Sequence, residues 1–210
     1  MSLAQSVINT ALTMSTSGLS AGRSGNVSVR DGQRVLITPT GMAYEDLEPT
    51  DIVSMALDGS VPSGSRKPSS EWHFHAATYA ARPDVGAIVH THSNAATALA
   101  CLEEGIPAFH YMVAAAGGHD IRCAPYATFG TEALAGFAVE ALKDRKACLL
   151  AHHGVIACGD TLSKAYELAV EVETLADQYG RARALGAVRL LGADEMQRVI
   201  EKFRNYGQPE

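Results

Sequence analysis

The sequence predicts an α/β protein of three layers, in which helices flank both faces of a central mixed, largely antiparallel sheet. Three observations favour this fold. Short apolar runs typical of buried strands lie between longer segments with helical spacing, the two kinds do not alternate strictly, and several runs are close enough to pair as hairpins. No internal repeat or linker is visible, so we expect one domain spanning residues 1–210.

The first part of the chain is expected to form two helices and three strands. The helices are predicted at residues 3–17 and 71–82, and the strands at 27–29, 35–37 and 52–55. Asp31-Gly32 is a strong turn signal between the first two strands. Ser69 and Ser70 suit the N-terminus of the second helix, and Pro83 stops that helix.

The rest of the chain continues the mixed pattern. A strand ends at His92, and Ser93 or Asn94 can cap the helix that follows it. The further strands are predicted at 109–113, 147–151 and 155–158, and the helices at 95–102, 131–142, 161–179 and 194–203.

Composition excludes several classes of protein. Hydrophobic residues make up 47% and charged residues 19%, and the net charge of −6 without a basic run argues against a nucleic-acid surface. No apolar stretch is long enough to cross a bilayer, and Met1–Ser20 lacks the pattern of a secretory signal. The four cysteines form no CxxC pair, and Cys148 and Cys101 are expected to be buried free thiols of a cytoplasmic protein. A cysteine nucleophile is not favoured, because no cysteine has an activating neighbour.

Histidines follow two of the predicted strands. His90-Thr91-His92 closes one apolar run, and His152-His153-Gly154 closes another. Residues two apart in a strand point to the same face, so His90 and His92 can bind one ion. A third imidazole from the second element would complete a three-histidine site with one open position, the pattern of a catalytic zinc site.

Three loops combine glycine with small hydroxyl residues. They are Gly22–Asn26, Thr38–Gly41 and Ser69-Ser70. Glycine lets backbone N–H groups approach an anion, hydroxyls add donors, and a helix N-terminus favours negative charge. Each loop alone is more often a turn or a helix cap, but the three together predict a phosphate pocket.

Glu71 begins a helix beside the third loop. Its simplest role is a favourable charge at a helix N-terminus, and its sharper role is a base placed between phosphate and metal. His75 lies four residues on, on the same helix face. Glu71 and His75 are compatible with a metal pair, but a base beside a packed histidine is favoured, and His73 is expected at the surface.

Several stretches together identify a family. They are Ser24–Ser28, Thr38–Gly41, Pro68–Trp72, His90–His92, His110–Met112, Ala124–Gly130, His153-Gly154 and Lys202–Gly207. With them the chain resembles the class II aldolase/adducin superfamily over nearly its whole length, and within it most closely the L-fuculose-1-phosphate aldolases. The resemblance implies the class II aldolase (AraD-like) fold.

The resemblance also implies a metal centre. It assigns one Zn²⁺ per subunit to His90, His92 and His153, and leaves His152 outside the ligand set. Glu71 would be the catalytic acid/base and the fourth ligand before substrate arrives. Three histidines and a carboxylate also suit other divalent ions such as Mn²⁺ or Co²⁺.

The remaining site residues are implied in the same way. Phosphate would be held by Asn26, Thr40, Gly41, Ser69 and Ser70. Tyr111 would be catalytic, assisting proton transfer across a subunit boundary in a homotetramer, and Phe129 and Tyr206 would shape the aldehyde end. Arg23 stands where the sugar aldolases commonly have threonine, and we expect it to contact phosphate.

The implied reaction is the reversible cleavage of a ketose 1-phosphate, of the L-fuculose 1-phosphate type, into dihydroxyacetone phosphate and an aldehyde of the L-lactaldehyde type. Zinc would stabilise the charge that C–C cleavage leaves on the product. An alternative is an aldolase for 5-deoxyribulose 1-phosphate or 5-methylthioribulose 1-phosphate in salvage. A pentulose-5-phosphate 4-epimerase, decarboxylase or dehydratase of the same fold is a further one. A scaffold like the adducin head is not favoured, because that head lacks the metal histidines.

Overall fold

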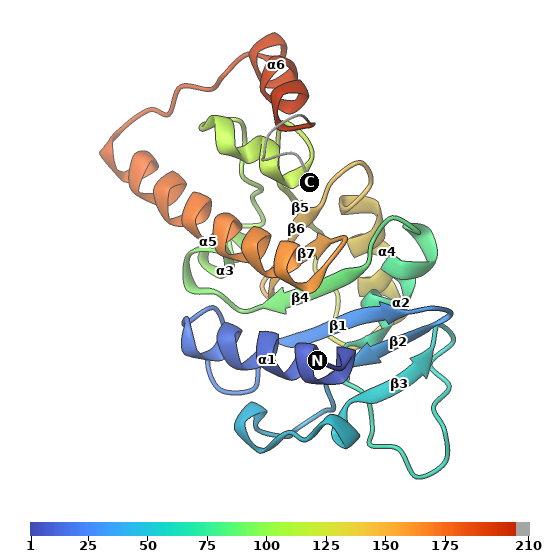
Figure 1. The fold of residues 1–210 in the computed structure, drawn as a ribbon. Coiled ribbons are helices and arrows are strands. Elements are labelled where there is room, and N and C mark those ends of the chain that lie inside the picture. Colours follow the sequence, from blue (N-terminus) through green and yellow to red (C-terminus); the bar gives the residue numbers. More distant parts are fainter. Residues whose placement is uncertain (205–210) are drawn as a thin grey trace.

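The structure is a computed structural model that describes residues 1–204, and it is built around one seven-stranded sheet (Figure 1). The strands are ordered β3-β2-β1-β4-β7-β6-β5, and every neighbouring pair is antiparallel except β5 and β6. Their bounds are β1 Asn26–Asp31, β2 Arg34–Ile37, β3 Val53–Ala56, β4 Ala87–Thr91, β5 Arg122–Ala124, β6 Ala147–Leu150 and β7 Gly154–Gly159. The predicted mixed, largely antiparallel sheet is confirmed.

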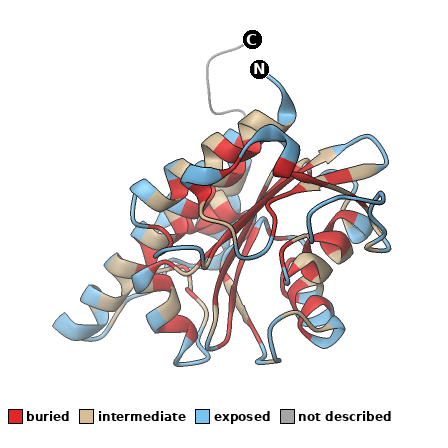
Figure 2. Cartoon of the chain, turned by 90° about the horizontal axis from the view of Figure 1, so that it is seen from below, coloured by how far each residue is buried: buried red, intermediate tan, exposed pale blue. Residues whose placement is uncertain are grey.

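Helices cover both faces of this sheet. Their bounds are α1 Leu3–Thr16, α2 Trp72–Ala81, α3 Asn94–Ala100, α4 Glu132–Ala141, α5 Leu162–Leu185 and α6 Ala193–Arg204. One apolar cluster joins the sheet to α1, α3 and α5, and a second joins its other face to α2 and α4. Figure 2 shows the buried residues gathered on the strands and on the helix sides that face them. The expected three layers are therefore present.

The central strand β4 alternates between the two apolar clusters. Ala87 and Val89 pack in the cluster with α1, α3 and α5, whereas Ile88 packs in the cluster with α2 and α4. Period-two alternation then places His90 and His92 on the side of α2, and the ring of His90 meets Phe74 of α2 edge-on. A fully buried strand thus delivers both imidazoles toward one helix.

The start of α3 is fixed by a distant carboxylate. Ser93 occupies the N-cap position, but its hydroxyl makes no capping bond. Glu173 of α5 instead accepts the N–H groups of Ala95 and Ala96 at 2.8 and 2.9 Å. The prediction that the side chain of Ser93 or Asn94 caps this helix is therefore wrong. The Glu173 carboxylate accepts the N–H groups instead, because its full negative charge makes it the stronger acceptor.

The strand predicted at residues 109–113 is wrong. Tyr111–Ala116 forms a 3₁₀ helix, η3, which begins where His110 Nδ1 accepts the N–H of Met112 at 3.2 Å and the His110 carbonyl accepts that of Val113 at 3.1 Å. These local bonds replace the pairing that a strand would need. The strand β5 was not predicted, because its three residues are too few to show a pattern in the sequence.

Two smaller expectations need correction. Cys101 is exposed because it follows the last turn of α3, and of the two cysteines expected to be buried only Cys148 is so. His73 is half-buried rather than at the surface, because its ring stacks on Trp72 at 3.9 Å between centroids. Within residues 1–204, none of the helices has both the length and the apolar composition that a membrane span requires.

Two glycines provide a matched test of the packing. A Cβ on Gly86, just before β4, would lie 2.0 Å from the carbonyl oxygen of Asp160, whereas a Cβ on Gly136 in α4 would meet no atom within 4 Å. We expect Gly86→Ala to lower the free energy of unfolding by about 1–3 kcal/mol. Gly136→Ala should raise it by about 0.5–1 kcal/mol, because alanine is the better helix former. Urea unfolding of both variants measures this, and equal effects would contradict the packing described.

Candidate metal centre and pocket

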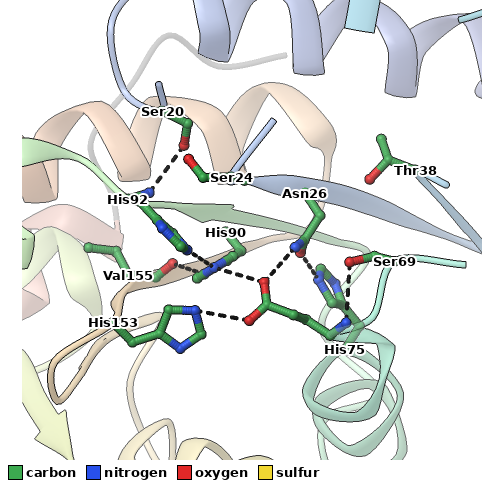
Figure 3. Close-up of polar contacts among 12 residues, drawn as sticks. Ser20, Ser24, Asn26, Thr38, Ser69, His75, His90, His92, His153 and Val155 are labelled. Atoms are coloured by element: carbon green, nitrogen blue, oxygen red, sulfur yellow. Dashed lines mark hydrogen bonds and ion pairs between the residues drawn. The ribbon is translucent and has the colours of Figure 1, made fainter. Parts of the chain in front are cut away.

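Four side chains converge beside the end of β4. Glu71, His90, His92 and His153 each offer one ligand atom, and these atoms all lie within 4.8 Å of one another. Figure 3 shows the imidazoles of His90, His92 and His153 directed toward a common point. His90 comes from β4 and His92 follows it, His153 precedes β7, and Glu71 precedes α2. The pairing of β4 with β7 thus places the second histidine element beside the first.

The hydrogen bonds of His90 define its tautomer. Nδ1 lies 2.8 Å from the Val155 carbonyl, which only accepts, so Nδ1 carries the proton and Nε2 presents a lone pair. The Nε2 atom of His90 lies 2.9 Å from Nε2 of His92 and 3.2 Å from Oε2 of Glu71. Burial, with the neighbouring His90 and His153, lowers the pKa of His92 to about 3, which favours its neutral form. A buried group of acceptors facing one another fits a bound cation.

Glu71 adds a negative charge to this group. Burial raises the pKa of Glu71, but positive charge placed at the adjacent His90 and His153 rings lowers it more, so the net pKa lies well below the ordinary range of a glutamate. Oε1 is 2.9 Å from Nε2 of His153 and accepts no hydrogen bond from the described residues. An ionised carboxylate with a free buried oxygen also fits a cation.

The start of α2 holds Glu71 in place. The helix begins at Trp72 rather than at residue 71, and Glu71 is its N-cap residue without a side-chain capping bond. Its N–H donates to the Ser69 hydroxyl at 3.3 Å, and the Ser69 N–H donates to the Thr38 carbonyl at 3.0 Å. The carboxylate is therefore free to face the histidines instead of the helix end.

His75 is not part of the cluster. It is fully buried one helical turn beyond Glu71, and both of its ring nitrogens are hydrogen-bonded, Nε2 to Asn26 Oδ1 and Nδ1 to Ser28 Oγ. The alternative in which Glu71 and His75 form a metal pair is wrong, because neither imidazole nitrogen of His75 has a free lone pair directed at Glu71. His75 is the packed histidine of the favoured interpretation.

Two glycines allow the strands at the centre to approach closely. A Cβ on Gly154 would lie 2.3 Å from the Thr91 carbonyl oxygen and 3.1 Å from the His92 ring. A Cβ on Gly25 would lie 2.6 Å from the His90 carbonyl oxygen. Only glycine leaves room at either position, so the two residues set how near His153 and Asn26 come to the β4 histidines.

A pocket of about 380 Å³ opens beside the cluster. Its walls include three of the four clustered side chains, Glu71, His92 and His153. All the residues expected to bind phosphate line it, namely Arg23, Asn26, Thr40, Gly41, Ser69 and Ser70, and so does Phe129. The three small-residue loops, far apart in sequence, are thus brought to one cavity.

Arg23 links two of these loops. Its Nη1 donates to the Gly41 carbonyl at 2.6 Å. The guanidinium therefore lies along the pocket wall instead of extending freely into solvent, and Arg23 is the one lysine or arginine among the residues that line this pocket. This geometry is compatible with the expected contact to phosphate.

One expected site residue is not brought to the pocket, and another cannot be compared with it. Tyr111 lies on η3, is 50% exposed and does not line the cavity. Tyr206 lies outside the described residues. Within one copy of the chain, the catalytic tyrosine implied by the resemblance is therefore separate from the cluster.

Other pocket residues were not singled out as site residues. Tyr126 lines the cavity and is 58% exposed, although an aromatic residue is usually part of a core. His152 also lines it, with a left-handed backbone (φ 54°) and its Nε2 3.1 Å from Glu103. Tyr44 closes the floor, and its buried hydroxyl donates to the Gly25 carbonyl. The position of His152 beside a strand-end histidine was its only signal, and Tyr44 had none.

Comparison with known proteins agrees with this geometry. Residues 5–179 match the sequence profile described as "Class II Aldolase and Adducin N-terminal domain". The chain belongs to this family. A solved structure of an L-fuculose 1-phosphate aldolase superimposes with a TM-score of 0.93 at 42% identity, covering 96% of each chain. The relatives described next are named as aldolases, which belong to the lyases.

Two curated relatives differ in their named substrates. A 5-methylthioribulose-1-phosphate/5-deoxyribulose-1-phosphate aldolase from Rhodospirillum rubrum is 55% identical over 99% of this chain and 93% of its own length. An L-fuculose phosphate aldolase from Escherichia coli is 50% identical over 98% of this chain and 95% of its own length. Class II aldolase chemistry is thus established for the chain, whereas its substrate is not.

Metal binding is testable by stability. We expect Zn²⁺ added to chelator-treated protein to raise the thermal unfolding temperature, since a ligand at a hundredfold excess over its Kd stabilises by about 2.7 kcal/mol. His153→Ala should lose most of this increase. His152→Ala is the control, because its exposed side chain pairs with Glu103 outside the cluster. Equal responses of the two variants would contradict the ligand set.

Proposed function

We propose that the protein is a zinc-dependent class II aldolase that reversibly cleaves a ketose 1-phosphate to dihydroxyacetone phosphate and a short aldehyde. The observation that carries the proposal is the juxtaposition of an ionised carboxylate and three imidazoles with a pocket walled by small hydroxyl and glycine loops. Such a site can stabilise negative charge beside a bound phosphate, which is what this reaction requires.

In this proposal His90, His92 and His153 hold one Zn²⁺ per subunit, with Glu71 as a fourth ligand before substrate enters. The cluster supports a small divalent cation, and its nitrogen and oxygen donors are also suited to Mn²⁺ or Co²⁺. When bound, the cation supplies Lewis-acid stabilisation of the charge that develops on the ketone oxygen.

Glu71 is the proposed acid/base. In the direction of condensation, its carboxylate removes a proton from the hydroxymethyl carbon of dihydroxyacetone phosphate, and that carbon forms a bond to the aldehyde carbonyl carbon. As a carboxylate placed beside the three imidazoles and the pocket, Glu71 can accept a proton at neutral pH. Cleavage is the reverse, with Glu71 returning the proton to carbon.

The phosphate is assigned to the loops of the pocket wall. Its proposed ligands are Asn26, Thr40, Gly41, Ser69 and Ser70, with Arg23 as an added cationic donor. Binding the phosphate away from the reacting carbons orients the substrate, so that part of the binding energy lowers the barrier.

Tyr111 is proposed to act on the substrate oxygen from a neighbouring subunit of a homotetramer. Its exposure on η3 and its absence from the lining of its own pocket support an arrangement in which a second copy supplies it. Phe129 and Tyr206 would shape the aldehyde end. Phosphorylated substrates carry charge and are retained within cells, which supports a cytoplasmic location.

Two substrates are supported to a similar degree. L-fuculose 1-phosphate is one, and the solved L-fuculose 1-phosphate aldolase with a TM-score of 0.93 supports it. The 5-deoxypentulose 1-phosphates are the other, and the relative of 55% identity named for them supports this reading. All of these sugars carry an apolar methyl or methylthio end, for which the exposed rings of Tyr126 and Phe129 provide a matching wall.

Glu71→Gln should lower kcat by about 10²–10⁴-fold, because the amide cannot accept the proton. Zinc content should be retained, since the three histidines are unchanged. Glu132→Gln, at the first residue of α4, is the matched control and should be fully active. Unchanged turnover of Glu71→Gln with metal bound would rule out Glu71 as the essential base.

The substrate is decided by a panel. Release of dihydroxyacetone phosphate is measured from L-fuculose 1-phosphate, 5-deoxyribulose 1-phosphate and 5-methylthioribulose 1-phosphate, with and without chelator. We expect chelator-sensitive release, and the ratio of kcat/KM values selects the substrate. No release from any of the three by zinc-loaded protein would contradict the proposal and favour epimerase, decarboxylase or dehydratase chemistry.

A further inference from the structure

A chain of buried polar side chains runs behind Glu71. Asn26 Nδ2 donates to Glu71 Oε2 at 2.9 Å, and Asn26 Oδ1 lies 2.5 Å from His75 Nε2. His75 Nδ1 is 2.7 Å from Ser28 Oγ, and Ser28 Oγ is 2.9 Å from the Tyr79 hydroxyl. Figure 3 shows the labelled Asn26 side chain joined to the His75 ring by a dashed line. Apart from Glu71, each member is at most 4% exposed.

Two regular elements supply this chain. Asn26 and Ser28 are two residues apart on β1 and therefore share a face. Glu71, His75 and Tyr79 follow one another at intervals of four on and just before α2, which places them along one side of the helix. The side chains of β1 and α2 alternate along the line, so no loop movement is needed to form it.

The chemistry of the carboxylate fixes the direction of every bond in the line. Asn26 donates from its NH₂ group to Glu71 Oε2, which places its Oδ1, an acceptor, against His75. His75 must then donate from Nε2, which leaves Nδ1 to accept the Ser28 hydroxyl proton. Tyr79 in turn donates to Ser28. The line has a single consistent polarity, with each group donating toward Glu71.

This polarity requires a neutral His75. Burial, aided by the neighbouring His90, lowers the pKa of His75 to about 3, so the ring has one donor and one acceptor nitrogen at neutral pH. A neutral ring in the Nε2–H form matches Asn26 and Ser28 together. The opposite tautomer would set two acceptors against each other at 2.5 Å on the Asn26 side.

We propose that His75 is a positioning residue for the aldolase, which holds the Asn26 amide in the one orientation that donates to Glu71. The inference rests on the proposed function of Glu71. Without a donor at Nε2, the amide can turn over and present its oxygen to the carboxylate. Glu71 then loses a hydrogen bond and meets a repulsive contact, so its orientation beside the cluster is no longer fixed.

A pair of amide substitutions separates this role from simple packing. In His75→Gln the side-chain amide reaches the place of Nε2 and can donate to Asn26, whereas in His75→Asn it reaches only the place of Nδ1. Both remove the imidazole. We expect kcat of His75→Asn to fall about tenfold, the loss of roughly one hydrogen bond to a charged group, while His75→Gln stays within about threefold of wild type. Zinc content should be unchanged, because the three histidines are intact.

Equal losses of kcat in the two variants, with wild-type protein active, would overturn the positioning role and leave the aldolase proposal standing. An inactive wild type would instead contradict the proposed function. The orientation itself has a separate measurement that needs no substrate and no variant activity.

That measurement is the ¹⁵N NMR spectrum of histidine-labelled, metal-free protein at pH 7. The His75 ring signals are identified by their loss in His75→Gln or, if that variant does not fold, by their contact with the stacked Phe74 ring. We expect the neutral Nε2–H tautomer. A protonated Nδ1, in either the other neutral tautomer or the imidazolium, would overturn the inference whatever the kinetics show.

Discussion

Four acceptor groups held together in a buried place are the constraint on which the structure depends. The lone pair of His90 faces His92 Nε2 and the Glu71 carboxylate at 2.9 and 3.2 Å, an arrangement that is unfavourable without a positive charge between them. The sheet tolerates this cost because β4, which carries His90 and is followed by His92, and β7, which His153 precedes, are neighbouring strands inside the sheet and are buried on both faces. Buried strands thus hold in place the groups that repel one another.

The metal cluster could be predicted from the sequence because strand geometry is local. His90 and His92 share a face by the two-residue period alone, and the apolar runs before both histidine elements indicate their strands. Spacing could not choose between His152 and His153. The choice depends on a left-handed residue at His152, which turns that side chain away and leaves His153 directed inward. No pattern in the composition predicts such a turn, and only the family resemblance favoured His153 over His152.

Contacts between distant segments were the part that sequence could not predict. The bond from Asn26 to Glu71 joins residues 45 positions apart, and Glu173 reaches the start of α3 from 78 positions away. Most helices were placed within two residues, because caps and prolines act locally. The strand predicted at 109–113 was wrong because a hydrogen bond to the His110 side chain, and not a pattern of apolar residues, sets the backbone conformation there. The role proposed for Tyr111 would need a second copy of the chain, which no single sequence describes.

Gly154 has a consequence for how such an enzyme changes its substrate. A Cβ at Gly154 would lie 2.3 Å from the Thr91 carbonyl oxygen and 3.1 Å from the His92 ring, so no side chain can be added next to His153 at this point. Side chains can vary more freely on the pocket wall around Tyr126 and Phe129, which are 58% and 63% exposed and carry little of the fold's packing. Evolution can therefore exchange one aldehyde for another by altering that wall while the reacting centre stays constant. Relatives of about 50% identity with different named substrates are what such a division of the pocket would produce.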